Sequence, residues 1–299
     1  MAEMPKIIEH QIPYPNSHPY ILTFGPDGGL WFCDSGAGQI CRMDVSTGVF
    51  HAFPLPRQNC QPVGIITGHD GHLWFTEYAG HKVGRITVDG RIAEFDLPTR
   101  SAGPNGIIDG PDGNVWFAET DVGQIARVSA HGIVSEEAKG IPAKSRPLAL
   151  AVRGDEIWFT LAAAGAIACR SADGAISVLA TESADSQPRA LTLHPNGDLW
   201  FVLTDANALA RVDCRNELTE HPVPTPGASL RGVVAGADGD LWFTENAANK
   251  IGRMRPDGTM VGEYDIPTSA SGARAIAAAP DGRLFFSQYD IGRIGEIRP

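Results

Sequence analysis

The hydrophobic pattern of this chain repeats with a period of about 42 residues. Each repeat starts with a short apolar run, such as PVGIITG (62–68) or GVVAG (232–236). A tight turn rich in Asp-Gly or Asn-Gly follows, and these dipeptides tolerate the positive φ of hairpin turns. A Trp-Phe segment, a third run such as KVGRITV, a second turn and an alternating run such as RIAEFDLP complete the repeat. Four short antiparallel strands per repeat, with no helical period, predict the blade of a β-propeller.

The tryptophans predict the number of blades. All six occupy the same place in the repeat, and a seventh copy, LFFSQ, has phenylalanine there. The spacing between successive positions is 42 or 43 residues, in the series Trp31, Trp74, Trp116, Trp158, Trp200, Trp242 and Phe285. The sequence therefore predicts an all-β, seven-bladed β-propeller with four-stranded antiparallel blades, and residues 1–299 as a single domain. We expect the Trp-Phe pairs to fill the space between neighbouring blades.

The two ends of the chain predict how the ring closes. The last repeat ends after its third strand, RIGEIRP (293–299), and the N-terminal KIIEHQIPYP (6–15) resembles the fourth strands of the other repeats. We expect residues 5–14 to supply the outer strand of blade 7. That strand would remove an open sheet edge from the protein.

Charge and composition exclude some partners. The formal net charge of −11 argues against nucleic acid or an anionic membrane, because both require a basic surface. The N-terminus has no basic flank followed by an apolar run, and no stretch approaches the ~18 apolar residues of a membrane span. We expect a cytoplasmic protein and a monomer.

The first strand of each blade lines the centre of a propeller, so two positions per repeat are expected at the channel mouth. One is the residue after the proline, or its equivalent, that opens each blade: Tyr20, Val63, Asn105, Leu148, Arg189, Arg231 and Arg274. The other comes three or four residues after the tryptophan position: Asp34, Glu77, Glu119, Leu161, Leu203, Glu245 and Gln288, each followed by Ser35, Tyr78, Thr120, Ala162, Thr204, Asn246 and Tyr289.

Blades 5, 6 and 7 thus present three arginines at equivalent positions, Arg189, Arg231 and Arg274, and two interpretations stay open. Guanidinium groups bind carboxylate or phosphate in a bidentate manner, so the mouth could hold an anion. Alternatively, the arginines pair with Glu245 and other carboxylates, because charges that face inward need partners.

Other polar side chains are candidates for the same mouth. Tyr20, Asn105 and Glu245 are further candidates for ligand binding. His18, just before Pro19 at the mouth of blade 1, is a candidate for proton transfer. Tyr289 is a second candidate for a catalytic role.

The repeats also resemble a known family. Segments of the form PxGI, WFTE, NKIGRI and EYxLP resemble the streptogramin B lyases, also called virginiamycin B lyases, most clearly in DLWFTENAANKIGRMRPDGTMVGEYDIPT (240–268). The resemblance covers the whole chain. It implies a seven-bladed propeller that opens a cyclic depsipeptide by elimination across its ester bond. It also implies Mg²⁺, with histidines and glutamates of the late blades as the functional residues.

The chain departs from the family pattern at those functional residues. The family has Pro-His opening blade 6, where this chain has Leu-Arg at 230–231, and Glu-Pro-His opening blade 7, where it has Gly-Ala-Arg at 272–274. The family's glutamate after the second strand of blade 7 falls at Tyr289, or at Gln288 if the loop shifts by one. An arginine stays protonated and cannot replace a histidine base. Loss of the glutamates removes the hard oxygen ligands that Mg²⁺ prefers.

Three functions are consistent with this sequence. The first is a binding or sensor propeller of lyase ancestry that holds an anionic small molecule or peptide at the channel mouth. The second is a metal-dependent enzyme of the lactone hydrolase type, which would use Asp34, Glu77 and Glu119 with Mg²⁺ or Ca²⁺, and His18 as a further candidate. The third is a streptogramin B-type carbon–oxygen lyase with a relocated site. A tightly bound metal ion would favour the second function. Turnover of a cyclic depsipeptide without incorporation of water would establish the third.

Overall fold

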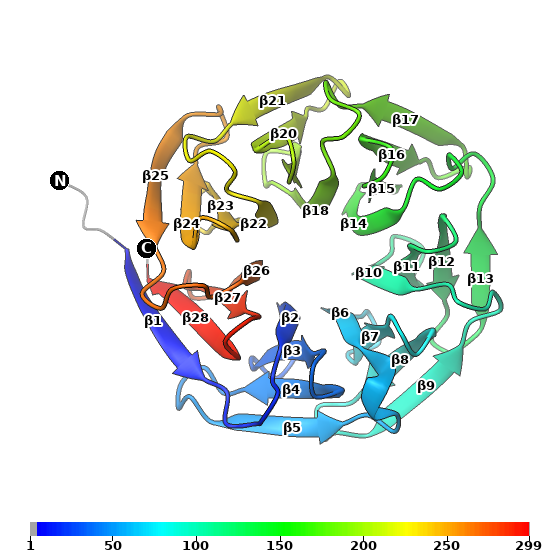
Figure 1. The fold of residues 1–299 in the computed structure, drawn as a ribbon. Helices are drawn as coiled ribbons and strands as arrows, with labels where there is room; N and C mark the ends of the chain where they lie inside the picture. The colour runs from blue at the N-terminus through cyan, green and yellow to red at the C-terminus, as the bar shows by residue number, and fades with distance from the viewer. Residues whose placement is uncertain (1–4, 299) are drawn as a thin grey trace.

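The chain folds as a seven-bladed β-propeller (Figure 1). The structure, a computed structural model, describes residues 5–298. Its strands pair into seven four-stranded antiparallel sheets, arranged as blades around a central axis. This confirms the fold predicted from the repeat. None of the helical segments described in the chain has the length and apolar character needed to span a membrane.

The inner two strands of each blade contain the apolar run and the Trp-Phe pair of the repeat. The first strands, nearest the axis, are β2 (Pro19–Phe24), β6 (Pro62–Thr67), β10 (Pro104–Asp109), β14 (Pro147–Arg153), β18 (Pro188–Leu193), β22 (Leu230–Ala235) and β26 (Ala273–Ala278). The second strands are β3 (Leu30–Asp34), β7 (Leu73–Glu77), β11 (Val115–Glu119), β15 (Glu156–Leu161), β19 (Leu199–Leu203), β23 (Leu241–Glu245) and β27 (Leu284–Gln288).

The outer two strands complete each blade. The third strands are β4 (Gln39–Met43), β8 (Lys82–Ile86), β12 (Gln124–Val128), β16 (Ala166–Arg170), β20 (Ala208–Val212), β24 (Lys250–Met254) and β28 (Arg293–Arg298). The fourth are β5 (Phe50–Pro54), β9 (Ile92–Asp96), β13 (Val134–Glu137), β17 (Ile176–Ala180), β21 (Leu218–Pro222), β25 (Met260–Asp265) and, for blade 7, β1 (Lys6–Gln11). A short 3₁₀ turn, η1 (Gln58–Cys60), precedes blade 2.

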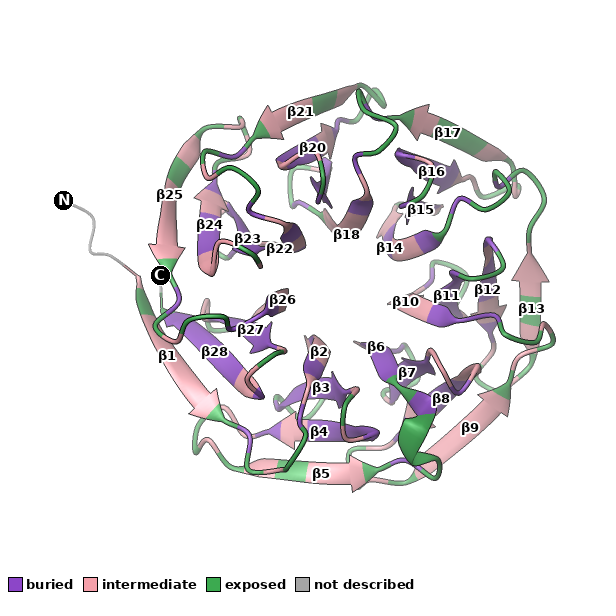
Figure 2. Cartoon of the chain, viewed as in Figure 1, coloured by how far each residue is buried: buried purple, intermediate pink, exposed green. Residues whose placement is uncertain are grey.

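Each interface between blades is filled by the tryptophan of one blade and the phenylalanine of the next. Trp74 of blade 2, for example, packs in one apolar cluster with Phe117 of blade 3. At the seventh interface Phe285 takes the place of tryptophan and packs with Phe32. The inner strands are mostly buried, whereas the outermost strands are partly exposed (Figure 2). The core is therefore a ring of interfaces, as the Trp-Phe pairs predicted.

Hydroxyl groups of the second strands join the first strands of neighbouring blades. The Thr76 hydroxyl accepts a hydrogen bond from the Gly64 N–H (2.9 Å) and donates to the Asn105 carbonyl of the next blade (2.6 Å). Thr244 in the same way donates to the Arg274 carbonyl (2.7 Å). These bonds fix the spacing of strands that surround the axis, and so they position the side chains that face it.

The N-terminal strand closes the ring, as predicted. β1 pairs antiparallel with β28, from Lys6 opposite Arg298 to Gln11 opposite Arg293. The Glu9 carboxylate accepts hydrogen bonds from the N–H (3.3 Å) and the hydroxyl (2.7 Å) of Thr268, in the loop after β25. Closure therefore ties both ends of the chain to blade 7 (Figure 1).

Candidate functional site

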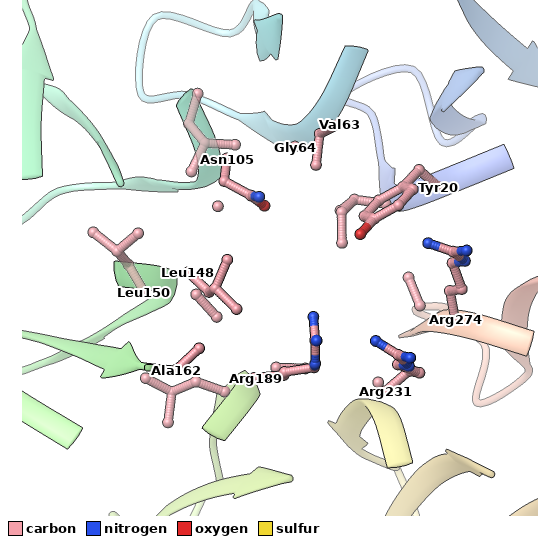
Figure 3. A pocket seen from close by; sticks show the side chains of 18 of the residues that line it. Tyr20, Val63, Gly64, Asn105, Leu148, Leu150, Ala162, Arg189, Arg231 and Arg274 are labelled. Carbon is pink, nitrogen blue, oxygen red and sulfur yellow. The ribbon is translucent and has the colours of Figure 1, made fainter. Parts of the chain in front are cut away.

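A cavity of about 1080 Å³ occupies the centre of the ring, and the first strands of all seven blades line it (Figure 3). Its lining includes the second residue of each of these strands: Tyr20, Val63, Asn105, Leu148, Arg189, Arg231 and Arg274. Each first strand contains a register shift just after its opening residue, for example between Pro62 and Ile65. A bulge of this kind releases a residue from the ladder and re-aims its side chain. The local backbone therefore directs this position into the cavity.

In the second set of predicted positions, the first residue of each pair lies away from the cavity. Asp34, Glu77, Glu119 and Glu245 are fully buried (0% exposed) and do not belong to the cavity lining. The last residue of the second strand is still paired in the ladder, as Glu245 is with Leu230, and the Glu245 carboxyl group lies near Glu263 and Lys250 of its own blade. These carboxylates were expected at the mouth, and the structure corrects that placement.

The residue after this position faces the cavity in several blades, as Ser35, Tyr78, Ala162 and Tyr289 do. The lining also contains loop residues that the sequence analysis missed: Arg146, Asp185, Gln187 and Asp205. The signal for Arg146 and Gln187 was their place directly before the prolines that open blades 4 and 5.

The three arginines lack carboxylate partners. Among residues 5–298, Arg231 and Arg274 make neither a hydrogen bond nor an ion pair through their guanidinium groups, and the Nε atoms of all three are buried without an acceptor. Arg189 donates one hydrogen bond, to the Gln187 side-chain oxygen (3.0 Å). Glu245 is not their partner, because the charged groups that act on it are Glu263 and Lys250 of its own blade. Glu245 therefore does not neutralise the charge of the three arginines.

The arginines also repel one another. Burial lowers the pKa of Arg189, and the neighbouring Arg231 lowers it further. Burial likewise lowers the pKa of Arg231, with Arg274 as the neighbouring charge. A guanidinium nevertheless stays charged in proteins. The cavity thus holds clustered positive charge that an anion would compensate.

Two tyrosines hold Arg274 in place. Its guanidinium carbon lies 3.6 Å from the centre of the Tyr289 ring and 5.2 Å from that of Tyr20. The two rings meet edge to face at 5.8 Å. His18 lies behind this group, where its Nδ1 is 2.8 Å from the Tyr289 carbonyl oxygen, and it is not part of the cavity lining. Tyr289 is therefore placed as a stacking surface for an arginine, and a catalytic role for His18 or Tyr289 stays a prediction.

The carboxylates that were candidates for metal binding are dispersed. Asp34 accepts hydrogen bonds from the Ser17 hydroxyl (2.7 Å), the His18 N–H (2.7 Å) and Gln39 (3.0 Å). Glu77 and Glu119 lie in two other blades. Within the described range 5–298, no group of three or more His, Cys, Asp or Glu side chains is arranged to hold a metal ion.

The cavity does not fit the Mg²⁺ that the family resemblance implies. Mg²⁺ binds through carboxylate and other oxygen ligands. At the corresponding positions this cavity presents the unpaired guanidinium groups of Arg231 and Arg274 and the aromatic ring of Tyr289. These guanidinium groups are hydrogen-bond donors and offer no lone pair to a metal ion.

Comparisons with known proteins agree with the fold. The chain matches the model of the Virginiamycin B lyase family over residues 5–145 and 135–299. A streptogramin B lyase structure is 29% identical, with 98% of this chain and 97% of that chain covered and a TM-score of 0.93. A virginiamycin B lyase from Staphylococcus aureus is 31% identical, with 99% of each chain covered and a TM-score of 0.93.

Two further solved structures match the chain, one at similar identity and one at low identity. A catalytically inactive histidine-to-alanine variant of the Staphylococcus aureus lyase, with quinupristin, gives the same 31% identity and TM-score of 0.93. A putative gluconolactonase is 16% identical with a TM-score of 0.62, which shows a shared fold alone. No curated protein sequence gives a significant match.

Proposed function

Because this chain belongs to the virginiamycin B lyase family, we propose that it retains the family's propeller and binds an anionic small molecule or peptide at the channel mouth instead of opening a depsipeptide ring. The residues to which the resemblance assigns the reaction are replaced by Leu-Arg at 230–231, Gly-Ala-Arg at 272–274 and Tyr289. Arginine cannot accept a proton as a histidine base does. The same replacement that removes the base supplies donors for an anion.

One observation carries this proposal: Arg189, Arg231 and Arg274 share one cavity and have no carboxylate partner among residues 5–298. A hydrogen bond to a charged group contributes about 1.5–3 kcal/mol. Two arginines on one carboxylate or phosphate therefore provide roughly 3–6 kcal/mol by the same arithmetic. Before the cost of ordering a ligand, this corresponds to an affinity between several millimolar and roughly tens of micromolar, and the ordering cost weakens it further.

Titration calorimetry with inorganic phosphate and with succinate tests the proposal. We expect the wild-type protein to bind at least one of them, and Arg231→Ala combined with Arg274→Ala to weaken binding at least tenfold. The single variant Arg231→Ala should not melt at a lower temperature than the wild type, because the Arg231 guanidinium has no hydrogen bond or ion pair among residues 5–298.

A matched control removes the same charge elsewhere. Arg57 and Arg91 are exposed and lie outside the cavity, so Arg57→Ala with Arg91→Ala should leave anion binding unchanged. Absence of binding by the wild type contradicts the proposal. A lowered melting temperature for Arg231→Ala alone contradicts it as well, since that would identify Arg231 as an internal structural partner.

A further inference from the structure

The charge of the cavity lining sets the charge of its ligand. Within the described chain the lining contains four arginines, Arg146, Arg189, Arg231 and Arg274, and two acids, Asp185 and Asp205. Two positive charges are therefore in excess, although the whole chain has a formal net charge of −11. A ligand with two negative charges neutralises this excess, whereas a monoanion leaves one charge uncompensated.

The opposite side of the cavity is apolar. Val63, Leu148 and Leu150 lie across from the arginines in Figure 3, with Asn105 as the polar side chain of that side. No charged side chain of the described first strands of blades 1 to 4 lines the cavity, but Arg146, in the loop directly before β14, does line it. Apolar area buried against such a surface contributes in proportion to the area removed from water.

The size of the cavity also argues against a small inorganic ion. Ligand pockets of drug-sized molecules span about 300–1,000 Å³, and this cavity measures about 1080 Å³. Tyr20 lies between Val63 and Arg274 in Figure 3, so an aromatic ring connects the apolar side with the cationic side. A ligand that contacts both sides needs a body as well as a charged head.

From these observations we infer that the ligand is an amphipathic dianion, with a doubly charged head on Arg189, Arg231 and Arg274 and an apolar or aromatic body against Val63, Leu148 and Leu150. This inference rests on the anion binding proposed above, and it adds the chemical class of the ligand. Phosphomonoesters and dicarboxylates with an aryl or alkyl group belong to this class.

Three probes separate the contributions of head and body. Phenylphosphonate at pH 8.5 has two charges and an aromatic body; benzenesulfonate has nearly the same shape and one charge; methylphosphonate has the head without the body. We expect calorimetry to show that phenylphosphonate binds at least tenfold more tightly than either of the other two.

Substitutions in the two halves of the cavity should act differently. Leu148→Asn should reduce the advantage of phenylphosphonate over methylphosphonate at least threefold and leave methylphosphonate affinity unchanged. Arg231→Gln should weaken both phosphonates. Val178→Asn, on an exposed outer strand, serves as the control for Leu148→Asn and should change neither affinity.

The outcomes distinguish this inference from the proposed function. If methylphosphonate binds through the arginines and phenylphosphonate binds no more tightly, the apolar part of the inference is wrong and the proposed anion binding stands. Equal affinity for phenylphosphonate and benzenesulfonate overturns the inference that the ligand carries two negative charges. If none of the probes binds, both the inference and the proposed function fail.

Discussion

At the scale of single residues, Arg231 lies between two other guanidinium groups and has no acceptor for its buried Nε among residues 5–298. Such a side chain is a cost to the unliganded fold, because a buried donor without a partner loses its hydration and like charges repel. The folded protein keeps these unpaired arginines although they destabilise it. A bound anion would relieve this destabilisation.

Replacing Arg231 with leucine should therefore stabilise the unliganded protein. We expect Arg231→Leu to raise the free energy of unfolding by about 1–2 kcal/mol, the usual penalty of an unsatisfied buried donor. Urea unfolding in a buffer without phosphate or carboxylate measures this. Adding phosphate should raise the stability of the wild type more than that of the variant.

Arg253 provides the matched control for this substitution. Its guanidinium bonds to Asp238 (3.0 Å) and Asp240 (2.6 Å) and lies over the Trp242 ring. Arg253→Leu should lower the free energy of unfolding. If both variants lose stability, Arg231 has structural partners and our description of the cluster is wrong.

The register of the repeat was enough to predict which residue of each first strand faces the centre. For the second strands it held in part: of the two consecutive positions predicted there, the first is buried, and the second faces the cavity in several blades. Alternation places Glu77 and its equivalents on one face of the strand, but the sequence does not show whether the strand ends before or after that residue. The ladder includes Glu77, opposite Pro62, so the next residue, Tyr78, turns toward the cavity.

At the scale of the blade, a buried carboxyl group of the second strand lies near a partly buried one of the fourth strand in blades 2, 3 and 6. Burial raises the pKa of Glu245 to about 7, and the charge of Glu263 on β25 adds to this rise, while Lys250 on β24 opposes it. Burial raises the pKa of Glu77 and of Glu119 to about 7 in the same way, with Glu94 and Glu136 as the second acids. The sequence signal for these pairs was a glutamate that recurs in the fourth strands IAEFD and VGEYD.

The raised pKa of Glu245 makes stability depend on pH. The folded state binds the proton more tightly than the unfolded chain, whose glutamate has an ordinary pKa of 4.5. Stability from this group is therefore complete below pH ~4.5 and is lost as the pH rises through ~7. We expect Glu245→Gln to be more stable than the wild type at pH 8, by about 1–3 kcal/mol since one pKa unit corresponds to about 1.4 kcal/mol.

Urea unfolding at pH 5 and pH 8 checks this prediction. The variant and the wild type should differ much less at pH 5 than at pH 8. Glu182→Gln, which changes an exposed glutamate, should show no such difference. A Glu245→Gln variant that is less stable than the wild type at pH 8 would contradict the account of this carboxyl pair.

At the scale of the whole molecule, the N-terminal strand joins the ends of the ring. Deleting residues 5–14 should expose the edge of β28 and remove the contacts of Ile12, which is 2% exposed. Burial of one such apolar side chain contributes about 1.5–3 kcal/mol, a large share of a typical net stability of about 5–15 kcal/mol. We expect a sharply lower melting temperature or loss of solubility, as measured by thermal unfolding and gel filtration.

A milder change keeps this test interpretable if the deletion does not fold. Ile12→Ala should cost about 2–5 kcal/mol, whereas Lys6→Ala, at the exposed start of β1, should leave the melting temperature unchanged. An unaltered melting curve for both Ile12→Ala and the deletion would show that β1 is not needed for closure.

The whole molecule should also lack the reaction of its family. We expect no opening of a streptogramin B ring above a control without protein, with or without Mg²⁺, when the products are separated by liquid chromatography. Loss of catalytic groups that act as a unit lowers a rate by roughly 10³ or more. Formation of a linear product of unchanged mass, lost in Arg231→Ala, would assign to the arginine a role in elimination.

A crystal structure of the protein soaked with phenylphosphonate would locate the bound anion. We expect the phosphonate within hydrogen-bonding distance of at least two of Arg189, Arg231 and Arg274, with the phenyl ring toward Leu148. Two results would contradict the claim that this propeller binds an anion. One is a phosphonate that binds outside the cavity, and the other is a set of arginines that pair with Asp205 instead of the phosphonate.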